Sequence, residues 1–109
     1  MFLILSADDH VSLGQGDDFK SFKLIIEDGS KSLNKVRAAL ATVAEVIDDK
    51  NAWISEAYLR RMPEVYDDDN WQRSLSSMIE LAKRYGWVDE ERKAIKAHIE
   101  WPEAASVKD

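Results

Sequence analysis

Asp8, Asp9 and His10 lie side by side in a glycine-containing loop near the start of the chain. Carboxylates and an imidazole can bind divalent metals, and they can transfer protons in general acid–base catalysis. A catalytic metal site needs ligands that converge from rigid elements, whereas three adjacent loop residues do not point toward one centre. We therefore expect no metal and no catalytic residue here. A small enzyme or accessory subunit that uses the Asp8–His10 loop is kept as an alternative.

Asp67, Asp68 and Asp69 form a second acidic group, directly before an expected helix. Carboxylates bind calcium, but an EF-hand loop spaces its ligands at alternate positions and needs a glycine and a distant glutamate, which this segment lacks. Carboxylates at a helix start also accept hydrogen bonds from free amides and interact favourably with the helix dipole. We expect these aspartates to cap the helix and to offer an acidic surface to a basic partner, without any cofactor.

The charge of the chain favours some classes of binding partner over others. The 109 residues include 21 acidic and 15 basic side chains, for a net charge of −6. Eight of the acids but three of the bases fall between Glu45 and Asn70, so that segment carries −5. A negative field repels nucleic acids and attracts basic proteins. The composition therefore predicts a protein partner with a basic surface and makes nucleic acid an unfavourable ligand.

Length and composition are typical of one globular domain, with 45% apolar residues. We place the domain at residues 1–102 and expect a flexible tail at 103–109. There is no cysteine, which excludes disulfides and thiol chemistry. The start of the chain lacks the basic residues of a secretory signal, and no segment approaches the roughly 18 apolar residues of a membrane span. These observations predict a cytoplasmic protein without membrane contact.

Hydrophobic periodicity predicts the order of elements. The expected elements are strands at 2–5 and 19–27, helices at 32–47, 55–62 and 69–85, and a strand at 95–101. Ser55 can cap the second helix, because its hydroxyl can accept a hydrogen bond from a first-turn amide. Gly86 ends the third helix by permitting a left-handed conformation, and Trp87 can fold back over the last turn. For the final segment, a helix at 90–101 is the alternative to a strand.

The order helix, helix, strand between Trp53 and Trp101 resembles that of winged-helix domains. The resemblance implies an α+β fold in which an N-terminal strand pair precedes a three-helix half that ends in a β-wing. Winged-helix proteins commonly present the third helix to DNA. Here the leading end of that helix carries Asp67, Asp68 and Asp69, which oppose phosphate contacts. A winged-helix transcription regulator is therefore the alternative and not the leading hypothesis.

The four tryptophans of the chain all fall between residues 53 and 101. Trp71 and Trp87 bracket the third helix, and we expect both to pack inside. Trp53 and Trp101 lie at the edges of elements, where tryptophan can anchor a protein interface. The candidate partner-binding residues are therefore Trp53, Asp67, Asp68, Asp69 and Trp101. The leading hypothesis is a small acidic regulatory or accessory module that is not an enzyme and binds another protein.

Overall fold

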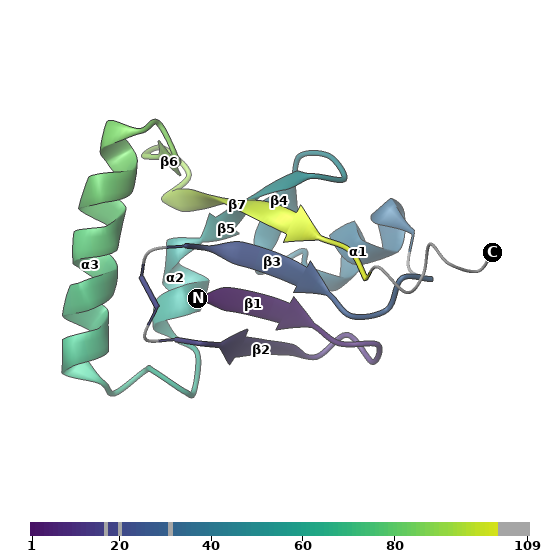
Figure 1. Ribbon diagram of the computed structural model, residues 1–109, viewed down its shortest axis with the longest axis horizontal. Helices are drawn as coiled ribbons and strands as arrows, with labels where there is room; N and C mark the ends of the chain where they lie inside the picture. Colours follow the sequence, from purple (N-terminus) through teal and green to yellow (C-terminus); the bar gives the residue numbers. More distant parts are fainter. Residues whose placement is uncertain (17, 20, 31, 103–109) are drawn as a thin grey trace.

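The computed structural model describes residues 1–102 of the protein apart from 17, 20 and 31 (Figure 1). The described strands are β1 (Phe2–Leu5), β2 (Val11–Gly14), β3 (Lys23–Ile26), β4 (Ala44–Val46), β5 (Asn51–Ser55), β6 (Val88–Asp89) and β7 (Ala94–Glu100). The described helices are α1 (Leu33–Ala39), α2 (Glu56–Arg60) and α3 (Asp69–Arg84). The strands form one mixed sheet that curls into a half-barrel. In Figure 1, α1 and α2 lie behind this sheet, and α3 stands across one end of it.

The strand order in the sheet is β2-β1-β3-β7-β5-β4. β1 pairs antiparallel with β2 and parallel with β3. The segment that connects β2 to β3 must therefore pass the start of β1. β7 runs parallel to β3 and antiparallel to β5. The short β6 pairs with the first residues of β7, on the same edge where β3 pairs with the last ones. β7 therefore joins the two halves of the sheet.

Alternation along the strands builds the core. In β5, Ala52 and Ile54 are fully buried while Trp53 between them is half-buried, as expected for side chains that point to opposite faces. The buried face meets Val36 of α1 and Leu59 of α2 in one hydrophobic cluster. The other buried members of this cluster include Leu3, Leu5, Leu24, Ile26, Leu75, Ile79, Ala97 and Ile99. Among the described residues, no polar or charged side chain is buried.

The predicted winged-helix architecture, with a strand pair and a three-helix half, is wrong. The centre of the molecule is a sheet of seven described strands, and the three helices are attached to it. The predicted wing is β7, which lies in the middle of the sheet because it pairs with β3, β5 and β6. What remains of the expectation is the α+β class. The predicted tail at 103–109 lies outside the described residues.

The predicted helix at 32–47 is correct only for its first half. Ser32 caps α1, with its side chain accepting a hydrogen bond from the Lys35 amide at 3.2 Å. The chain then turns and forms β4, which pairs antiparallel with β5. Asp48 lies in the connecting turn, where its Oδ1 accepts hydrogen bonds from the amides of Lys50 and Asn51. These bonds lower the pKa of Asp48. The apolar residues after α1 fit a helical period, but pairing with β5 decides their conformation.

The second and third helices and the last strand agree with the sequence. Ser55 caps α2, as predicted, by accepting a hydrogen bond from the Tyr58 amide at 3.2 Å. α3 begins at Asp69, and Asp68 is its N-cap, whose carboxylate accepts from the Trp71 amide at 3.0 Å. The segment after Asp89 contains a strand and not the alternative helix.

Candidate functional site

The Asp8–His10 loop forms the turn between β1 and β2. The Asp8 carboxylate accepts hydrogen bonds from the Ser6 hydroxyl and from the His10 amide. The bond from Ser6 is the main reason why the pKa of Asp8 is lowered, so this carboxyl group is poorly suited to act as a general acid near neutral pH. Within the described parts of the chain, no three His, Cys, Asp or Glu side chains gather closely enough to hold a metal ion.

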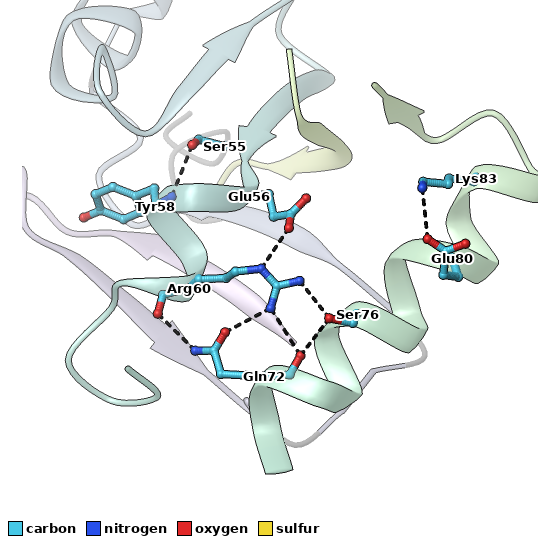
Figure 2. Close-up of polar contacts among 8 residues, drawn as sticks. All are labelled: Ser55, Glu56, Tyr58, Arg60, Gln72, Ser76, Glu80 and Lys83. Atoms are coloured by element: carbon cyan, nitrogen blue, oxygen red, sulfur yellow. Dashed lines mark hydrogen bonds and ion pairs between the residues drawn. The ribbon is translucent and has the colours of Figure 1, made fainter. Parts of the chain in front are cut away.

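Arg60 lines a cleft of about 300 Å³ between α2, α3 and the β6–β7 region, and Figure 2 shows its hydrogen bonds. Its Nε donates to Glu56 at 2.8 Å, and its Nη2 donates to the Ser76 hydroxyl at 2.9 Å. Its Nη1 donates to the backbone and side-chain oxygens of Gln72 at 3.2 and 3.0 Å. The side-chain Nε2 of Gln72 in turn donates to the backbone carbonyls of Arg60 and Val65. These reciprocal bonds fasten α2 to α3.

Lys83 lies farther along the same cleft. Its ammonium group contacts Glu80 at 2.9 Å and Glu90 at 3.8 Å. The hydrogen bond with Glu80 raises the pKa of Lys83, which keeps the amine protonated and therefore without a lone pair for nucleophilic attack. Because Arg60 and Lys83 both have acidic partners, the cleft serves better as a polar contact between elements than as a site of chemistry.

The predicted partner-binding residues do not lie on one surface. Asp67, Asp68 and Asp69 are at the start of α3, and Asp68 is engaged as its cap. Trp101 lies beside the β4–β5 turn, where its indole Nε1 donates to the Asp49 carbonyl at 2.7 Å. Trp53 is half-buried in β5, across from Glu45 of β4 and Lys96 of β7. That these five residues bind a partner stays a prediction. Binding through all of them would involve more than one surface of the protein.

Three exposed apolar side chains whose exposure the sequence did not predict lie at the end of α3. Leu81, Tyr85 and Trp87 are 52%, 62% and 52% exposed. The rings of Tyr85 and Trp87 stack with their centroids 4.9 Å apart and an interplanar angle of 25°. Leu81 is one helical turn before Tyr85 and therefore shares its side of the helix. We call these three residues the aromatic patch. The expectation that Trp71 packs inside is confirmed by its 7% exposure, whereas that for Trp87 is wrong.

The backbone around Gly86 fixes the position of the patch. Gly86 has φ of +74°, the left-handed conformation that ends many helices. Its amide donates to the Lys83 carbonyl at 3.2 Å, and the Trp87 amide donates to the Ala82 carbonyl at 3.1 Å. The Trp87 carbonyl accepts from the Lys96 amide of β7 at 2.8 Å. Trp87 is thus bonded on one side to α3 and on the other to the sheet, so its ring is presented from an ordered backbone.

Replacing Gly86 with alanine should lower the free energy of unfolding by about 1 kcal/mol. The added methyl group meets nothing within 4 Å, so the cost arises from the left-handed backbone and not from packing. Urea unfolding would measure the change. Gly86→Asn is the matched control and should cost less, because asparagine tolerates this conformation better than alanine. A stabilising effect of alanine would contradict the predicted helix end, since alanine stabilises positions inside a helix.

No protein-family model matches the chain, and neither a curated protein nor a solved structure matches it significantly. None of the helices in the described part of the chain is long and apolar enough to cross a membrane.

Proposed function

We propose that this protein is a small, non-catalytic binding module that contacts another protein through the aromatic patch. One observation supports this proposal above the others: Tyr85 and Trp87 are stacked and more than half exposed, although each has a large apolar ring. Tryptophan and tyrosine are the residues that most often dominate the binding energy of protein interfaces. A ring that is already ordered in the free protein loses less conformational freedom on binding.

Charge favours a basic partner for the same module. The net charge of −6 attracts a positively charged protein over a distance of several ångströms, which raises the association rate. The aromatic patch would supply contact area, while Asp67, Asp69 and other acids would act through their field. On this proposal, association slows as salt is added, because exposed charges are screened.

Affinity purification with purified variants would test the proposal. The double variant Tyr85→Ala/Trp87→Ala removes the stacked rings, and Tyr66→Ala removes an aromatic side chain that is 67% exposed outside the patch. We expect a partner protein from the native cell to be retained by the wild-type protein and by Tyr66→Ala, and to be lost with the double variant. Equal retention by all three proteins would contradict a role for the patch. Circular dichroism would verify that both variants are folded.

A further inference from the structure

In the part of the chain that the structure describes, no strand pairs with the outer edge of β2. The Ser6 amide donates to the His10 carbonyl at 2.9 Å, which sets the alternation of hydrogen-bonded pairs along the β1–β2 hairpin. Val11 and Leu13 fall at the positions between these pairs, so their backbone N–H and C=O groups point away from β1. An edge of this kind is the surface to which extended peptides add as a further strand.

At the opposite end of the sheet, α1 and the turn that follows it contact the outer edge of β4. Arg37 of α1 donates from Nε to the Val46 carbonyl at 3.3 Å and from Nη2 to the Ile47 carbonyl at 3.1 Å. The Ala44 amide donates to the Leu40 carbonyl at 2.8 Å. The outward carbonyl of Val46 and the outward amide of Ala44 are therefore engaged by α1 and the turn that follows it. Within the described residues, fewer outward backbone groups are therefore engaged at β2 than at β4.

At β2, the Glu64 side chain contacts the outer edge. Glu64 accepts a hydrogen bond from the Leu13 amide at 3.0 Å, and Glu64 is itself exposed. Beside this contact lies a pocket of about 580 Å³, which we call the seam pocket. It is lined on the β2 side by Asp9, His10 and Val11, and across from them by Thr42, Tyr58 and Glu64. Among the described residues, its lining includes the carboxylates of Asp9 and Glu64 and the imidazole of His10, but no lysine or arginine.

We infer that an extended segment of a partner protein adds to the outer edge of β2 and places a basic side chain in the seam pocket. The segment exchanges main-chain hydrogen bonds with Val11 and Leu13 and takes the place of Glu64 at the Leu13 amide. The released carboxylate, together with Asp9, then faces the basic side chain, and the Tyr58 ring offers a cation–π contact. The volume of the seam pocket falls in the range of small-molecule sites, so an arginine or lysine side chain fits.

The charges of the seam pocket select this occupant over a second copy of the chain. Two copies that pair through β2 would bring Asp9 and Glu64 of each molecule close to those of the other, and such like-charge contacts oppose association. A basic segment would instead be attracted by the carboxylates of Asp9 and Glu64. The inference shares the proposed protein-binding function but uses a different surface from the aromatic patch, so each can fail without the other.

Synthetic peptides provide a direct test. The probe is an acetylated and amidated seven-residue peptide of alternating threonine and valine with arginine at its centre, and its control has glutamate at the centre. We expect the arginine peptide to shift the backbone amide resonances of Val11 and Leu13 in nitrogen-15 spectra of the full chain. The glutamate peptide should bind at least about tenfold more weakly. An absence of shifts at millimolar peptide, or equal binding of the two peptides, would overturn the inference.

Val11→Pro is the matched variant of the protein. Proline removes an outward N–H from an edge strand, a position where it is tolerated, and it should weaken arginine-peptide binding at least about tenfold. If this variant fails to fold, the same peptide with alternate backbone nitrogens methylated replaces it, because methylation removes the donors from the other side. Unchanged affinity in the variant or the methylated peptide would overturn strand addition. Sedimentation that reveals dimers abolished by Val11→Pro would assign the edge to a second copy instead.

Discussion

Leu75→Ala should lower the free energy of unfolding by about 2–5 kcal/mol, the range measured when a buried leucine is truncated. Leu75 is fully buried at the middle of the buried stripe of α3, between Trp71 and Ile79. Truncation removes apolar contacts and leaves a cavity where α3 meets the rest of the core. Urea unfolding followed by circular dichroism would measure the change.

Leu81→Ala is a control in the same helix, with the same change of side chain. Leu81 is 52% exposed, so its truncation should alter stability by no more than about 0.5 kcal/mol. The difference between the two leucines isolates the contribution of burial, because helix propensity changes equally at both positions. A loss at Leu75 below about 1 kcal/mol, or equal losses at both sites, would mean that α3 is not packed as described.

Trp71→Ala should cost about 3–5 kcal/mol, the range for truncating a large buried aromatic side chain. Trp71 joins α3 to the segment that crosses from β2 to β3. Its indole Nε1 donates to the Gly16 carbonyl at 2.7 Å, and its ring lies 5.9 Å from that of Phe19, centroid to centroid. Alanine removes both contacts and opens a cavity at the end of the half-barrel.

Two further tryptophan variants identify the causes of this loss of stability. One isolates the hydrogen bond of Trp71, and the other is a control at an exposed position. Trp71→Phe retains much of the apolar volume but cannot donate to Gly16, and the lost hydrogen bond should contribute about 1 kcal/mol. Trp87→Ala removes a 52% exposed ring and should change stability little, by about 0.5 kcal/mol. Circular dichroism is the suitable probe, because these substitutions alter the tryptophan fluorescence itself. Equal losses at the two tryptophans would contradict their different burial.

The elements that the sequence predicted well are those whose signals are local. The long apolar stripe of α3, the Gly86 stop and the Ser55 cap each depend on residues within a few positions of one another. β7 alternates over its length, with Lys96 and His98 exposed between buried residues. These patterns specify the type of element but not its neighbours. The winged-helix interpretation was wrong about the neighbours of β7, since a single strand after a helix can be a wing or the middle of a sheet.

The elements that were missed depend on partners far away in the chain or on a weak pattern. β2 has four residues in a polar segment, and Val11 and Leu13 become a strand because they face Leu5 and Leu3 of β1. β4 lies in a segment where Leu40, Val43 and Ile47 have a helical spacing, and it is a strand because β5 lies beside it.

The aromatic patch was missed for a related reason. The apolar period of α3 includes Tyr85 and favours a buried Trp87 after the turn. Exposure of these rings depends on the direction that the chain takes after Gly86. Pairing of β6 with β7 sets that direction. Sequence alone therefore gives the residue types of the patch and the position of the turn, but not the side of the molecule on which the rings emerge.

The central position of β7 also has a consequence for synthesis on the ribosome. Lys23 of β3 pairs with His98 of β7, so 75 residues must be translated between one partner and the other. At roughly 5–20 residues per second, this interval lasts about 4–15 s. β3 has a bare edge throughout this interval, and β5 has one from its own synthesis until β7 pairs with it. The nascent chain must then depend on dilution or on chaperones to keep those edges from pairing with other chains. A translational pause before Ala94 would lengthen this vulnerable interval.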